Sequence, residues 1–234
     1  MNVVIGGASG IGAAVAALLP GETLVADRDG GTVRCDLTDP ASLVRVADMV
    51  DHLNALVVTA GVSPAMADAR TIFEVDLAGM ARVLQAFDAL VTAGSVAVCV
   101  ASMAGHLGTW PAETLECLDD PLSTPAAGLT DDPGTAYVLA KLGVLRLVRR
   151  TAPEWGRRGA RIVSVSPGVV DTPMGRLELS STHGTSDFAT GCALGRIGRA
   201  EEVAAVITFL CSEQASYLTG TDVLVDGGAV AVFG

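Results

Sequence analysis

A tyrosine and the only lysine of the chain lie four residues apart, in Tyr137-Val-Leu-Ala-Lys141. In a helix this spacing places both side chains on one face. An ammonium beside a phenol favours the phenolate and lowers the pKa of the tyrosine toward the range of a general base. Every other position counted as lysine or arginine is an arginine, which suggests that chemistry requires a lysine here. The pair predicts a tyrosine that acts as a general base; the alternative is a solvated lysine near a core tyrosine.

A glycine-rich turn follows the first apolar run, in the sequence VVIGGASGIG at residues 3–12. It places Gly6, Gly10 and Gly12 at the end of a strand and the start of a helix. Glycines there allow a tight turn, close approach of a pyrophosphate and close packing of helix on strand. The helix N-terminus adds unpaired N–H groups and a positive dipole. The turn alone also fits a purely structural strand end.

An acidic residue, Asp27, closes the second apolar run about twenty residues further on, at the position where a carboxylate accepts the ribose hydroxyls of a dinucleotide. The same carboxylate would repel a 2′-phosphate, so the sequence favours NAD over NADP. Arg28 keeps NADP open, because a guanidinium could tolerate that phosphate.

These residues need a scaffold that alternates strands and helices, and the chain has that pattern. Short β-branched runs at residues 3–5, 23–26, 33–35, 56–59, 96–100, 161–165 and 222–225 alternate with helix-patterned segments at 11–19, 43–53, 72–90, 135–155 and 200–210. The strand runs are continuously apolar, as burial on both faces requires. We therefore predict a Rossmann-like α/β fold: a doubly wound parallel sheet of about seven strands with helices on both faces. Ligands are expected beyond the carboxyl ends of its strands.

Two segments interrupt this rhythm within what we expect to be a single domain over residues 1–234. Residues 106–134 contain four prolines and no strong helical period, and residues 171–190 are rich in serine, threonine and glycine. Segments of this length are often lids or binding elements, with a solvated surface excursion as the alternative. If both fold over the site, their apolar side chains form a mostly apolar pocket: Leu107, Trp110, Leu115, Leu118 and Leu122 from the first, and Met174, Leu177, Leu179 and Phe188 from the second.

Composition excludes several functions. A formal charge of −11 is opposite in sign to what nucleic acid and anionic membrane surfaces select. The five cysteines contain no CxxC pair and the three histidines have no metal-ligand spacing, so we predict no metal site and reduced thiols. The N-terminus lacks the basic region of a signal peptide, and no apolar run is long enough to cross a bilayer. We expect a cytoplasmic protein.

Together these motifs resemble the short-chain dehydrogenase/reductase family. The resemblance is carried by GxxxGxG at residues 6–12, YxxxK at 137–141, and Pro167-Gly168 followed by Thr172, and it extends to LTG at 218–220 and VDGG at 225–228. The long segment before Tyr137 looks most similar to the bacterial 3α-hydroxysteroid dehydrogenase/carbonyl reductase branch.

The resemblance implies a catalytic set of Ser102, Tyr137, Lys141 and Asp76. Ser102 would hydrogen-bond the substrate oxygen, Tyr137 would act as the acid or base, and Lys141 would also hold the nicotinamide ribose. Asp76 stands where the family usually has an asparagine that holds a water beside the lysine. A carboxylate there raises the pKa of the lysine and partly cancels its effect on Tyr137, which predicts a higher pH optimum or a weaker proton relay.

The resemblance also implies residues that contact ligands. Asp36 would lie beside adenine, with a turn aspartate as the alternative, and Thr172 would hold the carboxamide, with a helix N-cap as the alternative. The implied cofactor-binding residues are Gly6, Ser9, Gly10, Ile11, Gly12, Asp27, Arg28, Asp36, Leu37, Ala60, Gly61, Tyr137, Lys141, Pro167, Gly168, Val170 and Thr172. The implied substrate-binding residues are Ser102, Met103, Tyr137 and Met174.

The sequence thus predicts an NAD-dependent oxidoreductase that transfers a hydride between nicotinamide and a secondary alcohol or ketone. An apolar ring ketone, such as a steroid or polyketide-like compound, is the expected substrate. The alternatives are a catalytically weak NAD-binding sensor or interaction protein, and an epimerase or dehydratase of the same family. The resemblance further implies a homodimer or homotetramer; an insert that shields the long helix would favour the dimer.

Overall fold

The computed structural model describes residues 1–123, 126–181 and 185–234. Within these residues, seven strands form one sheet: β1 (Asn2–Ile5), β2 (Thr23–Asp27), β4 (Val33–Arg34), β5 (Ala55–Val58), β6 (Val96–Val100), β7 (Arg161–Pro167) and β10 (Asp222–Val225). Their order is β10-β7-β6-β5-β1-β2-β4, and every neighbouring pair is parallel. The doubly wound parallel sheet predicted from the sequence is confirmed.

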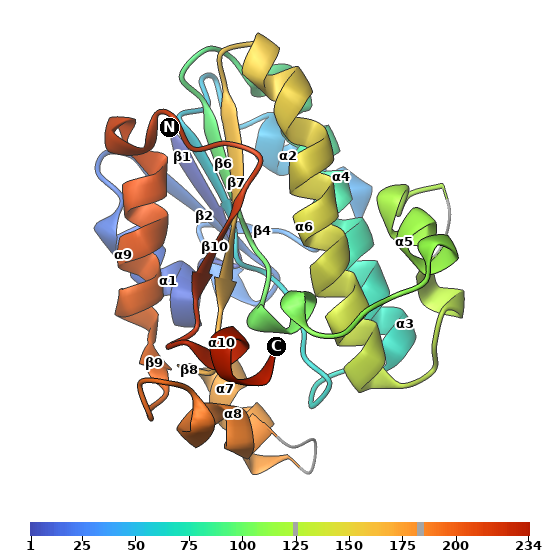
Figure 1. The fold of residues 1–234 in the computed structure, drawn as a ribbon. Coiled ribbons are helices and arrows are strands. Elements are labelled where there is room, and N and C mark those ends of the chain that lie inside the picture. Colours follow the sequence, from blue (N-terminus) through green and yellow to red (C-terminus); the bar gives the residue numbers. More distant parts are fainter. Residues whose placement is uncertain (124–125, 182–184) are drawn as a thin grey trace.

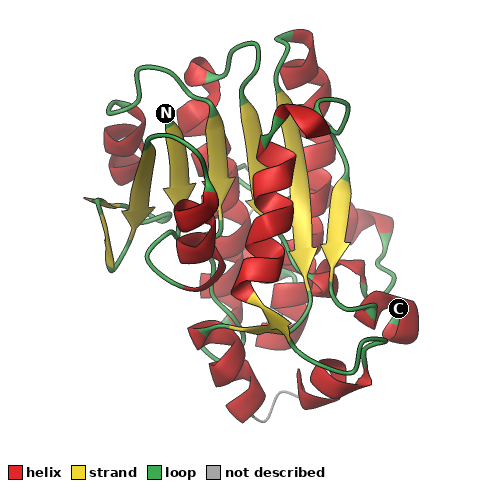
Figure 2. Cartoon of the chain, turned by 90° about the vertical axis from the view of Figure 1, so that its left-hand side faces the viewer, coloured by secondary structure: helices red, strands yellow, loops and turns green. Residues whose placement is uncertain are grey.

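Helices cover both faces of this sheet (Figure 1). The face with α1 and α9 is turned toward the viewer in Figure 2, where all strands of the sheet run the same way. Side chains alternate between the faces: Val3 and Ile5 pack in the cluster on one side, and Val4 packs in the cluster on the other. One face carries α1 (Gly10–Leu18) and α9 (Ala200–Cys211); the other carries α2 (Pro40–Ala47), α4 (Gly79–Phe87) and α6 (Pro133–Arg157).

The connection from β2 to β4 is unusually short. A parallel crossover normally needs a dozen or more residues, yet Ala26 already pairs with Val33. The short strand β3 (Gly30–Gly31) makes this possible, because both glycines adopt positive φ angles of +145° and +78°. The carboxyl end of β2, with Asp27, therefore lies next to an exposed loop and not beneath a crossover helix.

The predicted single helix over residues 72–90 is wrong in detail. The structure divides it into α3 (Ala69–Ile72), a π-helical turn η1 (Phe73–Ala78), α4, and a 3-10 turn η2 (Asp88–Leu90). A π-helical turn widens the helix and re-aims its side chains, and such turns are frequent at functional sites. Here it contains Asp76, whose side chain is buried.

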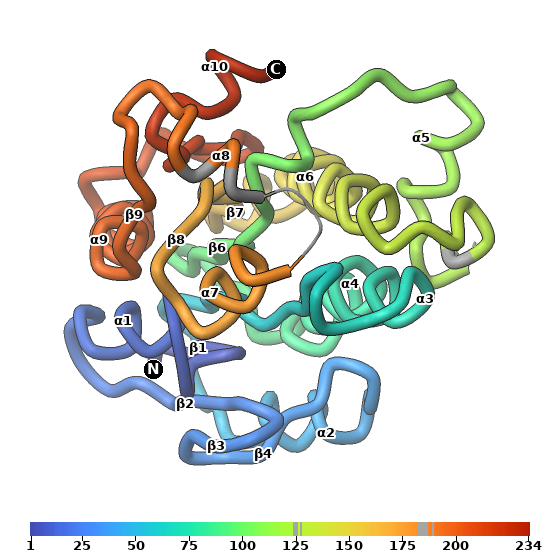
Figure 3. The backbone as a smooth tube through the Cα atoms, turned by 90° about the horizontal axis from the view of Figure 1, so that it is seen from below, coloured from blue at the N-terminus to red at the C-terminus, as the bar shows by residue number. Residues whose placement is uncertain are grey.

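The sequence predicted segment 106–134 to be a lid or binding element, with a solvated surface excursion as the alternative, but its described residues dock on neighbouring helices. It contains α5 (Ala112–Asp119), between the 3-10 turns η3 (Met103–His106) and η4 (Ala126–Gly128). Its apolar side chains pack against α3 and α6, where Leu118 is completely buried. The Asp119 carboxylate accepts hydrogen bonds of 2.6 and 2.7 Å from Arg146 of α6. In Figures 1 and 3, α5 lies on the outer side of α6 and α3, away from α7.

The C-terminal third closes the carboxyl edge of the sheet. Viewed from below, α7 lies over the strand ends between α1 and the α3–α4 segment (Figure 3). Among the described helices, none combines the length and the apolarity that crossing a membrane requires. The elements at the carboxyl edge are β8 (Val170–Asp171), which pairs with β9 (Gly198–Arg199), α7 (Pro173–Ser180), α8 (Thr185–Gly191) and α10 (Ala229–Phe233). The turn η5 (Glu213–Ala215) lies between α9 and β10, at the amino ends of the strands (Figure 1).

Replacement of Leu118 by alanine tests whether this segment is part of the core. Loss of a fully buried leucine should lower the free energy of unfolding by about 2–5 kcal/mol. The matched control is Leu122→Ala in the same segment, because that side chain is 43% exposed and its loss should change stability by no more than about 0.5 kcal/mol. Urea denaturation measures both; equal, small effects would contradict the packing described here.

Candidate active site

A cavity of about 370 Å³ lies at the carboxyl ends of β1, β2 and β5, and a smaller one of about 90 Å³ adjoins it. The larger cavity contains the glycine turn and the acidic end of β2. The smaller one contains Ser102, Tyr137 and Lys141. Their linings share Ile11, Thr59, Gly61, Thr172 and Met174, so the two cavities form one continuous site.

The glycine turn is packed so closely that side chains are excluded from it. A Cβ at Gly6, where φ is +86°, would overlap the backbone of Ala60, and one at Gly12 would overlap the Gly6 carbonyl oxygen. The Thr59 hydroxyl bridges β1 and β5, lying 3.1 Å from Ile5 O and 3.0 Å from Gly6 O. Together with the backbone N–H groups of Thr59 and Ala60, which both donate to Ile5 O, it ties the end of β5 to the start of the glycine turn.

The first turn of α1 faces this cavity without a negative side chain. Ser9 is its N-cap residue but makes no side-chain cap hydrogen bond, and the first turn carries no acidic residue. Free N–H groups and the positive end of the helix dipole remain for an anion such as a diphosphate.

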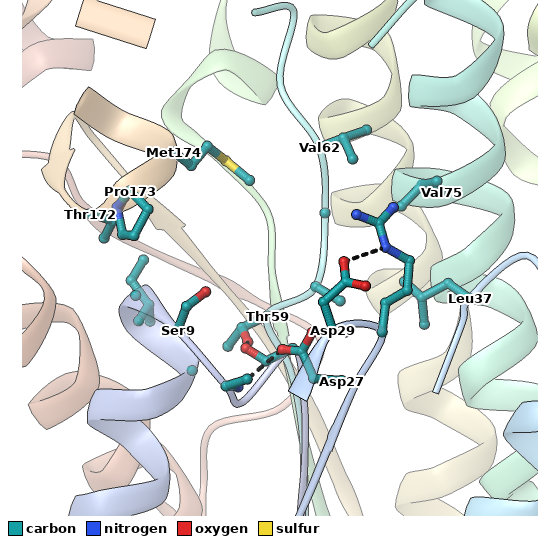
Figure 4. A pocket seen from close by; sticks show the side chains of 18 of the residues that line it. Ser9, Asp27, Asp29, Leu37, Thr59, Val62, Val75, Thr172, Pro173 and Met174 are labelled. Atoms are coloured by element: carbon teal, nitrogen blue, oxygen red, sulfur yellow. Dashed lines mark hydrogen bonds and ion pairs between the residues drawn. The ribbon is translucent and has the colours of Figure 1, made fainter. Parts of the chain in front are cut away.

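The acidic end of β2 is held against the glycine turn (Figure 4). Asp27 accepts a hydrogen bond of 3.0 Å from Ala8 N and another of 3.2 Å from Asp29 N. The Arg28 guanidinium pairs with the Asp29 carboxylate at 2.8 Å, which raises the pKa of Arg28. The arginine that could accept a phosphate is therefore already engaged by a carboxylate.

Asp36 follows β4 at the far end of the same cavity. Its carboxylate accepts bonds from the hydroxyl and the N–H of Thr38, which lower the pKa of Asp36. The turn-aspartate alternative is thus realised, in a residue that also lines the cavity with Leu37.

Tyr137 and Lys141 project from the same face of α6, with the lysine Nζ 5.3 Å from the centre of the tyrosine ring. Ser102 comes from the end of β6 and caps η3, where its hydroxyl accepts a bond of 3.2 Å from Ala104 N. Four residues later, His106 Nε2 lies 2.9 Å from Asp222 Oδ2 and 3.3 Å from Ser166 Oγ. This contact anchors the Ser102 turn to β7 and β10.

A buried ion pair lies behind the lysine. Asp76 Oδ2 lies 2.9 Å from Lys141 Nζ, without the geometry of a regular hydrogen bond, and Asp76 Oδ1 accepts one of 2.8 Å from Val62 N. Burial lowers the pKa of Lys141, but Asp76 and Tyr137 outweigh it and raise that pKa above its ordinary value. Burial raises the pKa of Asp76, against the opposing effect of the ammonium and the Val62 N–H.

These charges also act on the tyrosine. The Tyr137 ring retains some exposed surface, but desolvation of its hydroxyl raises the pKa of the phenol. Lys141 and the Ser102 hydroxyl lower that pKa, whereas the carboxylates of Glu178 and Asp76 raise it. The net shift is upward, so the phenol is the dominant form at neutral pH.

Most of the residues singled out in the sequence meet at this site. The larger cavity contains Gly6, Ser9, Gly10, Ile11, Gly12, Asp27, Arg28, Asp36, Leu37, Ala60 and Gly61, and the smaller one contains Ser102, Tyr137, Lys141, Pro167, Gly168 and Val170. Thr172 and Met174 line both. Thr172 is also the N-cap of α7 and accepts a bond of 3.0 Å from Gly175 N.

The structure corrects one site residue predicted from the sequence and adds another. Met103 does not line either cavity; it is buried in a separate cluster with Cys192 and Ala229, because its turn faces α10. Glu178 of α7, which sequence reasoning missed, lines the smaller cavity. The sequence signal that could have identified Glu178 is its spacing of four residues after Met174, which places both side chains on one helical face.

The residues present fit a nicotinamide dinucleotide. The turn allows close approach of a diphosphate because Gly6 and Gly12 lack side chains, and the start of α1, without a side-chain cap, offers N–H groups to an anion. Asp27 offers carboxylate oxygens for ribose hydroxyls at one end of the cavity. At the other end, Tyr137, Lys141 and Thr172 offer polar groups beside the space that a nicotinamide ring would occupy.

Comparison with known proteins agrees with this geometry. A family model described as enoyl-(acyl carrier protein) reductase matches residues 123–230. The chain is 34% identical to a short-chain dehydrogenase/reductase of Alternaria brassicicola, covering 98% of this chain and 96% of that protein. It is 32% identical to cis-4-hydroxycyclohexanecarboxylate dehydrogenase of Sinomonas cyclohexanicum over the same shares of the two chains. The crystal structure of 3-alpha-hydroxysteroid dehydrogenase from Pseudomonas sp. B-0831 complexed with NADH superposes with a TM-score of 0.88, at 28% identity, covering 98% of this chain and 96% of that one.

Removal of the lysine charge tests the buried ion pair. Lys141→Met leaves the Asp76 carboxylate buried and unpaired and should lower the free energy of unfolding by about 3–5 kcal/mol at neutral pH. Burial raises the folded-state pKa of Asp76 above its unfolded value, so stability is lost as pH rises and the defect should shrink toward acidic pH. Urea denaturation from pH 5 to 8 measures this. The control Asp76→Asn/Lys141→Met should recover stability and lose the pH dependence; a pH-independent defect in Lys141→Met would contradict the assignment.

Proposed function

The chain belongs to the short-chain dehydrogenase/reductase family and is an oxidoreductase that acts on CH–OH groups, and from this premise we propose that it is an NAD-dependent enzyme for a secondary alcohol or ketone. One observation carries the proposal: a cavity lined by Ser102, Tyr137 and Lys141 opens directly onto the cavity of the glycine turn. The bound nicotinamide dinucleotide supplies or accepts the hydride.

The protein's own groups handle the proton and the substrate oxygen. In ketone reduction, the Tyr137 phenol donates its proton to the carbonyl oxygen, while the Ser102 hydroxyl donates a hydrogen bond that stabilises the developing negative charge. In alcohol oxidation, the Tyr137 phenolate takes the hydroxyl proton. Lys141 holds the phenolate by its charge, and Asp76 holds Lys141 in position.

The charges around the adenosine end support NAD over NADP. Asp27, Asp29 and Asp36 all line this end of the cavity, and a 2′-phosphate would be repelled by them. Arg28 is the one nearby base among the described lining residues, and its guanidinium is paired with Asp29.

The lining of the smaller cavity supports a cyclic, largely apolar substrate. Ile11, Val100, Val170 and Met174 supply apolar surface around the catalytic groups. Two of the similar proteins are named for cyclic alcohols, a hydroxycyclohexanecarboxylate and a hydroxysteroid, which supports the ring; the apolar character of the substrate rests on the cavity lining alone. We propose an apolar ring ketone, with the pocket formed by α7 and not by the segment 106–134.

We also propose that the enzyme is a cytoplasmic homodimer. The docking of α5 on α6 covers the outer face of the long helix, which removes one surface for association. The edge strand β10 and the helix α9 keep exposed apolar side chains, among them Leu224 and Phe209. Light scattering would give twice the monomer mass, and a monomer would contradict the proposal.

The variant Tyr137→Phe tests the chemical role of the tyrosine. Loss of the acid–base group should lower kcat by about 10²- to 10⁴-fold with NADH affinity unchanged. NADH absorbance with a panel of cyclic ketones and alcohols, repeated with NADPH, measures activity and cofactor preference. Full activity of Tyr137→Phe would overturn the mechanism. Tight NADH binding by the wild type without turnover of any ketone would favour the sensor alternative.

The pH profiles of the two directions test the charges around Tyr137. Because the pKa of the phenol is raised, reduction should persist to alkaline pH, whereas oxidation, which needs the phenolate, should increase with pH. Asp76→Asn removes one carboxylate that raises this pKa, so the rise in oxidation should move to lower pH, with activity near neutrality kept or increased. An unchanged oxidation profile in Asp76→Asn would refute this assignment.

A further inference from the structure

A carboxylate with no part in hydride transfer lines the catalytic cavity. Glu178 lies on α7, one helical turn after Met174, and both side chains border the space next to Tyr137. Among the described residues that line the smaller cavity, Glu178 is the one acid.

The placement of α7 is closely constrained. Thr172 caps its first turn, and a Cβ at Gly175 would overlap the Val170 carbonyl oxygen. The helix is thus held tightly against β8, and its inward face is determined by this packing. Glu178 therefore borders the cavity because of the position of the helix and not because of one side-chain rotamer.

The charge of Glu178 is opposed by its burial and supported by its neighbours. Burial and the Asp76 carboxylate raise the pKa of its carboxyl, the charge of Lys141 and the hydroxyl of Ser63 lower it, and the net shift is upward. Ser63 is fully buried, and its hydroxyl forms no hydrogen bond of regular geometry among the described residues. Its effect on the Glu178 carboxylate is therefore that of a nearby hydroxyl dipole. Interactions between charges are stronger in such a poorly hydrated cavity than in water.

We propose that Glu178 is a specificity-determining residue: it accepts a hydrogen bond from a hydroxyl or ammonium group of the substrate, remote from the reacting carbon, and discriminates against substrates that carry a carboxylate. The proposal rests on the proposed function and deepens it, because it adds one polar requirement to an otherwise apolar ring ketone. A charge-assisted hydrogen bond favours such a donor, and two carboxylates in one cavity repel each other.

Four cyclohexanones with NADH test this preference. They carry a hydroxyl, an ammonium, a methyl or a carboxylate group at the ring carbon opposite the carbonyl. For the wild type, kcat/KM should be at least about tenfold higher for each of the two donors than for the carboxylate, as expected where a site hydrogen-bonds a substrate group. The hydroxyl and ammonium arms separate neutral from cationic donors.

Variants at position 178 assign the preference to the charge. Glu178→Gln keeps the shape and should reduce the ratio of ammonium to carboxylate kcat/KM by about tenfold or more, whereas Glu178→Asp should retain the preference. The matched control is Glu154→Gln on an exposed position of α6, which should leave all ratios unchanged. If Glu178→Gln changes all four substrates by one common factor, Glu178 has a structural role only and the proposal is overturned.

A binding measurement decides the proposal without turnover. Calorimetry with the NADH-loaded protein compares cyclohexylammonium with cyclohexanecarboxylate. The wild type should bind the ammonium more tightly, and Glu178→Gln should remove that difference. Equal binding of the two ions, or binding of neither, overturns the inference whatever the kinetics. Absence of turnover with a retained binding preference overturns the proposed function alone.

Discussion

The ion pair between Asp76 and Lys141 joins the three segments on which the catalytic cavity depends. It connects the π-helical turn to α6, and the second oxygen of Asp76 holds the loop after β5 through Val62 N. A buried pair offsets only part of its own desolvation, so stability alone is a poor reason for it. Its effect here is geometric, because it fixes the ammonium beside the Tyr137 ring. The pair also lies against the backbone of Gly61, where the Cβ of a larger residue would lie only 3.2 Å from Asp76 Oδ1.

That geometry has an electrostatic consequence. Two carboxylates, Asp76 and Glu178, act on one ammonium, Lys141, and both raise the pKa of Tyr137. Both carboxylates therefore oppose the effect of Lys141 on the phenol, and the pKa of Tyr137 is raised overall. The acid–base group of the site is thus controlled by charges on three different elements: η1, α6 and α7.

Much of the fold and the central part of the site could be predicted from local sequence. Apolar runs such as residues 96–100 and 222–225 coincide with β6 and β10, because a strand buried on both faces must be apolar throughout. The spacing of Tyr137 and Lys141 sufficed because one helix holds both residues. The family recognised from these motifs is confirmed by the full-length relatives.

Features that depend on tertiary packing were beyond sequence reasoning. The helical period of residues 72–90 does not indicate a π-helical turn, since the extra residue is stabilised by what Asp76 contacts and not by local propensity. The apolar residues of segment 106–134 fitted a lid equally well, and only the Arg146–Asp119 contact and the burial of Leu118 against α6 distinguish a docked element from a lid. The resemblance implied Met103 as a substrate contact, but its side chain is buried in a separate cluster with Cys192 and Ala229.

The position of α7 links cofactor binding to substrate selection. At its start, Thr172 lies against the glycine turn, where a Cβ at Gly10 would be 3.3 Å from its methyl group. Two residues later, Met174 borders both cavities, and one turn after Met174, Glu178 borders the catalytic one. The first turn of this short helix is fixed by the Thr172 cap and by the contact of Gly175 with Val170. The side chains that border the cofactor cavity and the carboxylate of Glu178 are therefore held by one closely packed element. Cofactor binding and substrate selection consequently depend on the same helix, since the element that borders the cofactor cavity also carries the carboxylate that selects the substrate.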